Sequence, residues 1–350
     1  MKLLKKKDDK KTEQERVDER REEVLATGRK FKYPLQWTKH RIVVNTILIS
    51  IVTLSLIIVG GWFALYKVGM TNDLLYRVTK IVPLSVADVD GESVLFSDYL
   101  MLYRSSMKSI ERQSGSQFDQ GSVDELRAEY KRGALTEAEK YAYANKLAKE
   151  NNVTVTDEEI KEEFNRHLKI GGADRSEESF MKIIDENFGL SREEYDRMLY
   201  MGLLKSKVEI AIDQNANSVA SRVESLLSSS SNDYHSVADQ LGSAIKFEET
   251  GGLVDSKNID GGRAAEAITL QPGESSGKFI STNGDGYYFV KLINKTDTEV
   301  NFVSIKVPFT EFDKRFLALQ ADDKIVEHIS IKDPTVIEAS ASETSEEQSQ

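Results

Sequence analysis

The side chains that most often carry out chemistry in proteins are scarce in this sequence. The chain has 350 residues but contains no cysteine and only four histidines. Without cysteine it has no disulfide, no thiolate metal site and no thiol nucleophile. The histidines stand far apart and lack the spacing of metal ligands; they are His40, His167, His235 and His328. We therefore expect neither a metal nor any other cofactor.

Other groups that could act in catalysis have simpler interpretations. Glu248 and Glu249 are adjacent in an expected loop, where carboxylates are usually solvated rather than paired for proton transfer. His235 lies on a short predicted helix, at a position expected to face solvent. The doublets Gly171-Gly172 and Gly261-Gly262 lack the strand and helix that flank a phosphate-binding loop, so we expect turns there. The sequence thus predicts no catalytic residue.

Charge divides the chain into a basic head and an acidic body. Residues 1–41 hold 14 Lys or Arg and 8 Asp or Glu, a balance of +6; the whole chain carries −11, so −17 remains for residues 42–350 (−11 minus 6). Nucleic-acid binding favours basic residues that are not diluted by acidic ones. We therefore expect residues 1–41 to be a solvated cytoplasmic tail, and we expect no nucleic-acid partner.

A single long apolar stretch separates the head from the body. Residues 42–65 contain no charged side chain, and about 20 apolar residues suffice to cross the hydrocarbon core as a helix. The stretch is longer than the apolar region of a cleaved signal peptide, and no Ala-x-Ala site follows it. We therefore predict one transmembrane helix over residues 42–66. Its interfacial residues would be Trp37, Lys39, Arg41, Trp62 and Tyr66.

The basic flank predicts the orientation of this helix. Lysine and arginine beside a membrane helix stay on the cytoplasmic side. The protein should therefore be a single-pass protein of the cell membrane, with its N-terminus in the cytoplasm and its acidic body outside. Residues 67–83 should form a stalk that ends at Pro83.

Local patterns predict a mainly helical first half of the body. Alternation around Asp90-Gly91 predicts a strand, a tight turn and a second strand, followed by a helix capped at Ser97. Apolar residues at three- and four-residue steps, and capping boxes at Thr156 and Ser191, predict the helices that follow. These helices should span residues 123–150, 157–168, 180–188 and 192–228, the last with a break near 213–217.

Strand patterns dominate the second half of the body. After a serine-rich loop at residues 228–232, a short helix is expected over 234–241. Runs of β-branched and aromatic residues then predict strands over 286–293 and 300–307, paired as an antiparallel hairpin. The last elements should be a helix over 309–329 and a disordered acidic tail over 335–350, which is too polar to bury a core.

The order of these pieces resembles the SurA/PrsA group of envelope foldases. In that group a helical chaperone domain is followed by a parvulin-type prolyl isomerase domain. The first part of the resemblance implies a SurA-N-like helical domain over residues 84–217. It is carried by Val86–Gly91 with Phe96–Tyr99, by Ala148–Glu159, and by Phe180 with Leu190–Tyr195.

The second part of the resemblance implies a parvulin-like domain over residues 218–334. The matching features are a Gly-Gly-x-Leu turn, a Leu-x-Pro-Gly segment and a strand that begins with Gly-Tyr. Their residues are Gly251, Gly252, Leu253, Leu270, Pro272, Gly273, Gly286, Tyr287 and Tyr288.

The parvulin-like part departs from its family where catalysis would occur. Parvulins are taken to lower the barrier of about 18–20 kcal/mol to prolyl amide rotation with paired histidines, an acid or thiol, and an apolar pocket. Tyr288 replaces the histidine of the last strand, and Arg263 falls at the pocket phenylalanine. The acid position falls near Ser243 and Ala244. The strand that carries the other histidine is missing, and we hypothesise that residues 300–307 fill its place.

The helical part contains apolar and aromatic clusters that could hold an extended polypeptide. Methionine and tyrosine adapt to varied partners, so a face left over from core packing would suit unfolded chains. The alternative is that all of these residues belong to the core. The candidates are Tyr99, Tyr103, Met107, Tyr195, Met198 and Met201.

Together these features predict an α+β fold. It would combine a single N-terminal transmembrane helix, a SurA-N-like helical domain and a small parvulin-like α/β domain with an antiparallel sheet. The predicted function is a membrane-anchored extracytoplasmic chaperone for unfolded or newly exported polypeptides, located beside the export channel, with an inactive parvulin-like domain. Two alternatives stay open: an active prolyl isomerase with an unorthodox site, and a cell-envelope scaffold that binds one fixed partner.

Overall fold

The chain divides into two units, and the boundary falls between Ala64 and Leu65. The computed structural model describes residues 12–114, 120–230 and 233–331. The acidic tail predicted over residues 335–350 lies outside this description, as do Ser231 and Asn232 of the predicted loop. Each unit is described by itself below.

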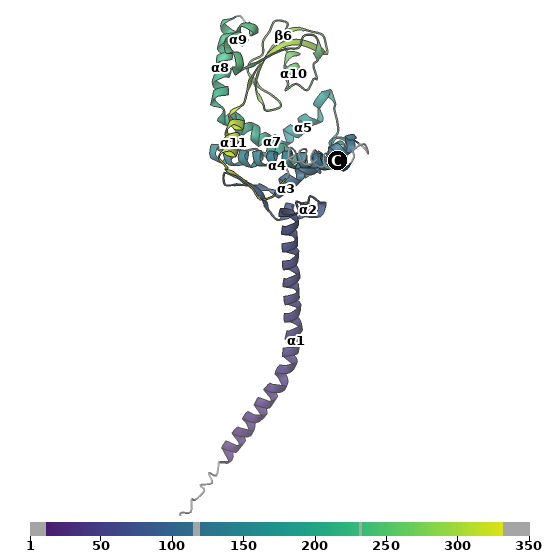
Figure 1. Ribbon diagram of the computed structural model, residues 1–350, viewed down its shortest axis with the longest axis vertical. Coiled ribbons are helices and arrows are strands. Elements are labelled where there is room, and N and C mark those ends of the chain that lie inside the picture. The colour runs from purple at the N-terminus through teal and green to yellow at the C-terminus, as the bar shows by residue number, and fades with distance from the viewer. Residues whose placement is uncertain (1–11, 115–119, 231–232, 332–350) are drawn as a thin grey trace, which may run out of the picture. The chain divides into compact units, whose positions relative to one another are not determined.

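The first unit consists of one long helix over its described residues. Helix α1 (Glu13–Tyr66) continues by two residues into the second unit (Figure 1). Its segment Arg41–Tyr66 is long and apolar enough to cross a membrane, and no part of its most apolar window is buried. This confirms the predicted apolar helix. The side chains of Trp37 and Lys39 lie outside the description.

A three-stranded antiparallel sheet joins the beginning and the end of the second unit. Strands β1 (Ser85–Val89) and β2 (Glu92–Leu95) form the predicted hairpin. Asp90 and Gly91 make the turn with positive φ angles of 48° and 87°, the backbone that a two-residue hairpin favours. The third strand, β8 (Ile325–Glu327), pairs with the other edge of β1.

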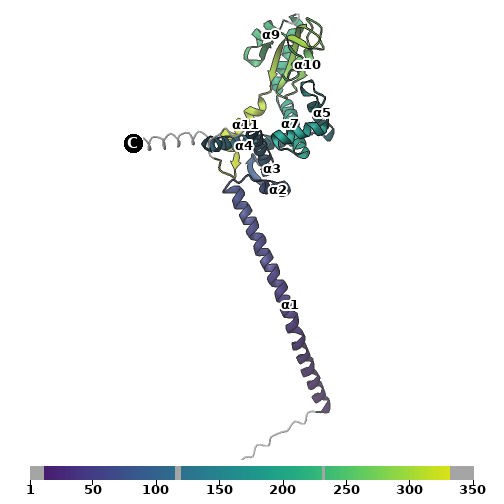
Figure 2. The same ribbon diagram turned by 90° about the vertical axis from the view of Figure 1, so that its right-hand side faces the viewer.

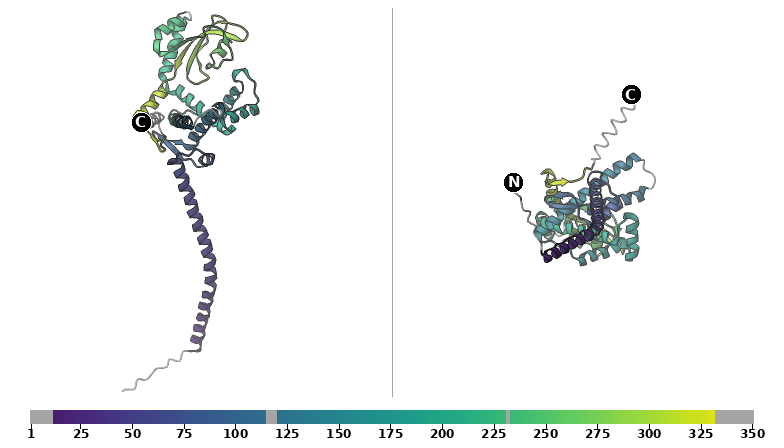
Figure 3. Two further views of the ribbon diagram at one scale, coloured as in Figure 1. Left: turned by 45° about the vertical axis from the view of Figure 1, so that its right-hand side comes forward. Right: turned by 90° about the horizontal axis from the view of Figure 1, so that it is seen from below.

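Strand β8 lies where a helix was predicted. Helix α11 (Glu311–Ala321) ends early, so the predicted helix over 309–329 is wrong in its last turns. The left-handed Asp323, with φ of 52°, turns the backbone so that β8 can reach β1. The ring of Tyr143 lies 5.3 Å from that of Phe312 on α11. The yellow end of the chain thus belongs to the helical body (Figure 3).

The helical body contains six helices besides α11 in the part of the second unit that the structure describes before residue 213. They are α2 (Asp73–Ile81), α3 (Phe96–Ser114), α4 (Gln120–Asn151), α5 (Asp157–Leu168), α6 (Glu177–Phe188) and α7 (Arg192–Ile212). Both predicted capping boxes are confirmed, at Thr156 and Ser191. Ser97 does not cap α3, because the helix begins at Phe96 directly after β2.

Residues 214–309, which we call the sheet module, lie between α7 and α11 along the chain. Its elements are α8 (Gln214–Ser229), α9 (Tyr234–Leu241), β3 (Lys246–Glu249), β4 (Val254–Asp255), α10 (Arg263–Ala267), β5 (Phe279–Ile280), β6 (Gly286–Lys295) and β7 (Glu299–Pro308). Figures 1 and 2 show this module on one side of α5 and α7, with α2, α3 and α4 on the other side.

The sheet of the module is antiparallel and covered on both faces. Its strand order is β3-β7-β6-β5, and β4 also pairs with β7. Strands β6 and β7 form the predicted hairpin. Helices α8 and α9 cover the face that carries Phe289 and Ile305, while α10 covers the face that carries Val290 and Leu292. Strand β3 includes Glu248 and Glu249, so the expected loop there is a strand.

One buried carboxylate accepts hydrogen bonds at both chain connections between the helical body and the sheet module. Asp213 is 1% exposed and separates α7 from α8. Its Oδ1 accepts a hydrogen bond from Ala216 N at 2.8 Å, which caps α8. Its Oδ2 accepts hydrogen bonds from Thr310 N at 2.7 Å and Glu311 N at 3.1 Å, where α11 begins. The chain therefore leaves and re-enters the helical body at the same side chain.

Replacing Asp213 with alanine should destabilise this junction. A lost helix cap costs about 1 kcal/mol and an unsatisfied buried donor about 1–3 kcal/mol, so we expect the free energy of unfolding to fall by about 2–4 kcal/mol. The matched control is Asp233→Ala, which removes one exposed cap bond from Ser236 N at 3.2 Å and should cost about 1 kcal/mol. Denaturant unfolding of the full chain in detergent measures both, and equal losses would contradict the double role of Asp213.

Helix α4 buries a second carboxylate, which has no such partners. Glu139 is 2% exposed, and within the described residues its Oε1 accepts no hydrogen bond. Burial raises the pKa of Glu139 to about 7; the negative charge of Glu327 also raises it, while Arg132 lowers it. Arg132 instead pairs with Glu327 at 2.5 Å. The folded protein therefore favours the protonated form of Glu139.

This pKa makes stability depend on pH. Because the folded value lies above the unfolded value of about 4.3, the contribution of Glu139 is complete below about pH 4 and is lost as the pH rises through about 7. Relative to the parent, Glu139→Gln should gain about 1–3 kcal/mol of unfolding free energy between about pH 5 and pH 8. The control is Glu150→Gln, at an exposed position of the same helix. Parallel pH profiles for the parent and Glu139→Gln would contradict the prediction.

Candidate functional site

A pocket of about 400 Å³ lies where the helical body meets the sheet module. Helix α7 supplies its apolar lining, α5 supplies charged groups, and the turn between β5 and β6 supplies small polar groups. The apolar lining is Met198, Leu199 and Leu203, beside Gly202. The polar lining is Glu163, Arg166, His167, Tyr195, Ser206, Ser281, Thr282, Asn283 and Gly284.

The charged groups of α5 form one hydrogen-bonded cluster. Glu163 Oε1 lies 3.2 Å from His167 Nε2, and Arg166 holds both oxygens of the same carboxylate, with Nε 2.9 Å from Oε2. His167 Nδ1 shares a hydrogen bond with Tyr195 Oη on α7. Burial would raise the pKa of Glu163, but the hydrogen bonds and charges of His167 and Arg166 outweigh it and lower the pKa to about 2. Glu163 is therefore a fixed negative charge that orients both partners.

Tyr195 on α7 is held in place by aromatic neighbours on two other helices, α5 and α6. Its ring lies 5.9 Å from Phe164 and 5.6 Å from Phe180, both edge to face. The guanidinium of Arg192 lies 3.4 Å from the centroid of the Phe164 ring. Burial raises the pKa of Tyr195 to about 12, and the charge of Glu163 adds to this shift. Tyr195 is therefore a neutral hydroxyl in a rigid setting, able to take part in hydrogen bonds.

The turn of the sheet module is seated closely against α7. Arg166 Nη2 donates to Thr282 O at 3.4 Å, and Asn283 N donates to Ser281 Oγ at 3.1 Å. Gly284 has φ of +70°, and a Cβ there would lie 2.5 Å from Oγ of Ser206. Glycine suits this approach, because any other residue would be strained by the backbone angle and would require the Ser206 side chain to move. One side of the pocket is thus formed by a turn that packs on helix α7.

The six candidate polypeptide-binding residues fall into two groups. Tyr195 and Met198 line the pocket. The others belong to the buried core of the helical body, although Tyr103 and Met107 also line a separate depression beside α3, α4 and α6; the four are Tyr99, Tyr103, Met107 and Met201. Burial favours the core interpretation for Tyr99 and Met201.

Sequence reasoning missed the polar side of the pocket. Glu163 and His167 stand four residues apart on a helix that was predicted correctly, and this spacing was the available signal for a pair on one face. The turn over residues 281–284 meets α7 across a gap of about 80 positions in the sequence, for which no local pattern exists.

A second polar cluster lies on the face of the sheet that α10 covers. Tyr288 on β6 is 4% exposed, and its cross-strand neighbour is Lys306 on β7. Arg263 from α10 pairs with Glu248, donates to Ser304 Oγ at 3.3 Å, and stands 5.2 Å from the centroid of the Tyr288 ring. Burial would lower the pKa of Arg263, but the hydrogen bond and charge of Glu248 outweigh it and raise the pKa.

The remaining charges of this face are also paired. Lys306 forms an ion pair with Asp285. Burial would raise the pKa of Asp285, but the hydrogen bond and charge of Lys306 outweigh burial and lower it. Burial raises the pKa of Tyr288, and the charge of Asp285 adds to the shift. His235 lies elsewhere, with its side chain exposed on α9 and its Nε2 3.0 Å from Glu249. Among the described residues, no histidine faces the Tyr288 cluster.

The parvulin-like motif residues serve mainly as turns and core. Leu270 and Tyr287 are buried, and Tyr287 Oη donates to Asn217 Oδ1 at 2.6 Å. Gly273 N donates to Leu292 O at 2.8 Å, which brings the Pro272-Gly273 turn onto β6. A Cβ at Gly286 would lie 2.5 Å from Val307 O, so glycine permits close pairing of β6 and β7 there. The Gly251-Gly252-Leu253 turn is more open, with Leu253 46% exposed.

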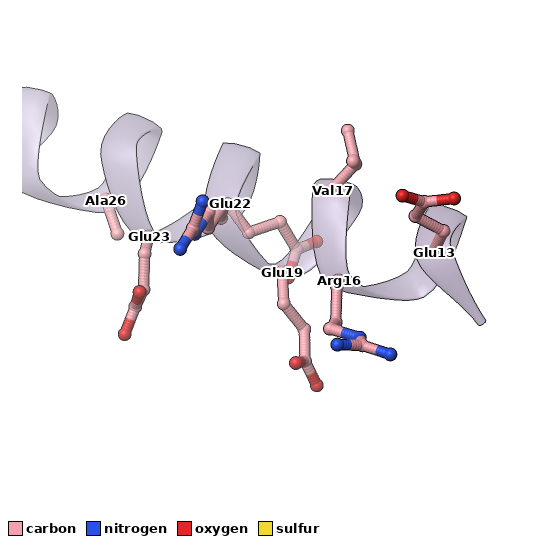
Figure 4. Close-up of a pocket in the computed structure, with 8 residues that line it drawn as sticks. Glu13, Arg16, Val17, Glu19, Glu22, Glu23 and Ala26 are labelled. Atoms are coloured by element: carbon pink, nitrogen blue, oxygen red, sulfur yellow. The ribbon is translucent and has the colours of Figure 1, made fainter. Parts of the chain in front are cut away.

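A shallow depression along α1 offers no enclosed site. Figure 4 shows Glu13, Arg16, Glu19, Glu22 and Glu23 projecting from this helix, and all eight lining residues come from it. A single helix face has no opposite wall, so these side chains remain solvated charges. Among the described residues, no group of three or more potential metal-ligating side chains exists.

Comparison with known proteins gives one family match. The model of a SurA-like N-terminal domain matches residues 35–209, which is half of the chain. The matched segment includes the pocket-lining parts of α5 and α7 and ends before the sheet module. No curated protein and no solved structure matches the chain.

Proposed function

Because this chain belongs to the family of the SurA-like N-terminal domain, we propose that it is a membrane-anchored chaperone that binds unfolded, newly exported polypeptides outside the cell membrane. The family supports a chaperone-type function. The finer parts of the proposal, namely the anchoring, the orientation, the binding site and the inactive sheet module, rest on the arguments below.

The pocket between the helical body and the sheet module is the observation that carries the proposal. Met198, Leu199 and Leu203 would receive an apolar side chain, and about 400 Å³ is within the usual size range of ligand sites. The hydroxyls and amides around this apolar lining would bond to the main chain of an extended segment. A main chain is common to all polypeptides, so such a pocket would accept many sequences with an exposed apolar residue.

Anchoring and orientation follow from the apolar segment of α1. Residues Arg41–Tyr66 are long enough to cross the hydrocarbon core. The +6 balance of residues 1–41 favours the cytoplasmic side, and the acidic remainder would then lie outside. Binding at the outer surface would bring the pocket close to chains that emerge from the export channel.

The sheet module is proposed to be a parvulin-like domain without isomerase activity. Strand β7 pairs with both β6 and β3, as the hypothesis of a replaced strand requires. Lowering an amide barrier of about 18–20 kcal/mol requires groups that act on the rotating bond. Here Arg263 and Lys306 are neutralised by Glu248 and Asp285, and the Tyr288 ring is buried beneath them.

The chaperone proposal predicts that the full chain suppresses aggregation of several unrelated unfolded proteins. Met198→Glu places a charge in the apolar lining and removes burial of a client side chain worth about 1.5–3 kcal/mol, so suppression should need about tenfold more protein or more. Leu317→Glu is the matched control, because Leu317 is 61% exposed on α11. Light scattering during dilution from denaturant measures the effect.

Two outcomes would count against this proposal. If both variants suppress aggregation as well as the parent, clients bind elsewhere than the pocket. If the parent itself suppresses the aggregation of none of these proteins, the scaffold alternative with one fixed partner gains support.

The inactive module predicts no acceleration of prolyl isomerisation. The full chain in detergent should not accelerate the cis-to-trans isomerisation of a proline peptide. The time constant should stay at its spontaneous value of about tens to hundreds of seconds. An acceleration that is lost in Tyr288→Phe but kept in Tyr287→Phe would contradict the proposal and favour the active isomerase. Tyr287 is a suitable control because its side chain lies on the opposite face of the sheet.

A further inference from the structure

Exposed apolar side chains are concentrated directly after the apolar segment of α1. Fourteen large apolar residues are exposed in the described part of the second unit, and six of them fall within residues 68–82. The six are Val68, Met70, Leu74, Val78, Ile81 and Val82, with exposures from 42% to 83%. Scattered exposure needs no explanation, but a cluster in so short a segment indicates a surface that meets an apolar environment.

Helix α2 presents three of these six residues on one face. Leu74, Val78 and Ile81 follow each other at steps of four and three, so they form one stripe. The opposite face carries Tyr76 and Thr79, which are 5% and 2% exposed. The apolar stripe is therefore not the side by which α2 packs on the body.

The inner face of α2 is firmly attached. Tyr76 Oη donates to Glu194 Oε1 at 2.5 Å, and the Arg104 guanidinium lies 4.5 Å from the centroid of the Tyr76 ring. Arg104 also pairs with Asp73, and Lys80 lies 3.4 Å from Glu193. These contacts fix the rotation of α2, so the outer stripe cannot be buried by a turn of the helix about its own axis.

Chain connectivity limits how far the stripe can lie from the apolar segment of α1. Only residues 67–72 separate the end of α1 from α2, and even fully extended they span at most about 25 Å. Tyr66, the last residue of the apolar segment, donates from its Oη to Ser85 O at 2.7 Å, which keeps the connection short. The exposed Arg77 stands beside the stripe on α2, and the exposed Lys67 directly follows the apolar segment; both charges would complement the anionic headgroups of a bilayer.

We propose that α2 lies in the headgroup region of the outer membrane leaflet, with Leu74, Val78 and Ile81 inserted toward the acyl chains. Amphipathic helices of this kind bury their apolar face about 5–10 Å into the boundary between headgroups and acyl chains. Because α2 is fixed to the helical body through Tyr76, this contact orients the whole body on the membrane instead of leaving it on a free stalk. The inference rests on the anchoring in the proposed function.

The absence of cysteine makes a direct test possible, because each single-cysteine variant carries one label. The full chain is reconstituted in phosphatidylcholine vesicles with a minority of phosphatidylglycerol. An environment-sensitive fluorophore is placed at Val78→Cys, at Leu54→Cys in the apolar segment and at Leu317→Cys on α11; all three parent residues are exposed, so folding should be kept. Nitroxide-labelled lipids and aqueous iodide serve as quenchers.

We expect the fluorophore at residue 78 to have a blue-shifted emission that nitroxide-labelled lipids quench, as at residue 54. The fluorophore at residue 317 should be quenched by iodide only. Adding Leu74→Asp to Val78→Cys should abolish the lipid quenching at residue 78. If residue 78 behaves like 317 while 54 is still protected, the lipid contact of α2 is wrong and the anchor stands. If residue 54 is also open to iodide, the anchoring itself is wrong and the inference falls with it.

Discussion

The hydrogen bonds of the Asp213 carboxylate are the interaction on which the arrangement of the second unit depends. The carboxylate accepts hydrogen bonds from the start of α8 and from the start of α11, so one side chain terminates both connections to the sheet module. A buried carboxylate that accepts three N–H donors is stable because its charge is met by the dipoles of two helix N-termini. With both connections fixed at one point, the module can place its β5–β6 turn on α7, and the pocket exists only because of that placement.

The pocket combines rigid and adaptable parts in a way that suits varied polypeptides. Its polar side is held by the Glu163 cluster and the aromatic packing of Tyr195. Its apolar side includes Met198, whose flexible thioether side chain fits differently shaped groups. A fixed hydrogen-bonding side with an adaptable apolar side would recognise the main chain and one apolar side chain without a strict sequence preference.

Local secondary structure was predictable from the sequence, whereas contacts between residues far apart in the chain were not. The Asp90-Gly91 hairpin and the capping boxes at Thr156 and Ser191 appear where they were expected, because each depends on residues close together in the chain. Strand β8 was predicted as helix because its pairing with β1 spans more than 230 positions. The sequence pattern of the apolar and aromatic residues on α3 and α7 does not show which of them are buried. Only tertiary packing places Tyr99 in the core and Met198 in the pocket.

The proposed chaperone function requires that unfolded chains are held at the pocket beside Met198. The most direct measurement places a photo-crosslinking residue at position 198 of the full chain in living cells, with position 317 as the control, and identifies the captured proteins. We expect many different exported polypeptides to be captured at position 198 and few at position 317. One dominant partner at position 198, or an equal yield at both positions, would contradict the proposed function.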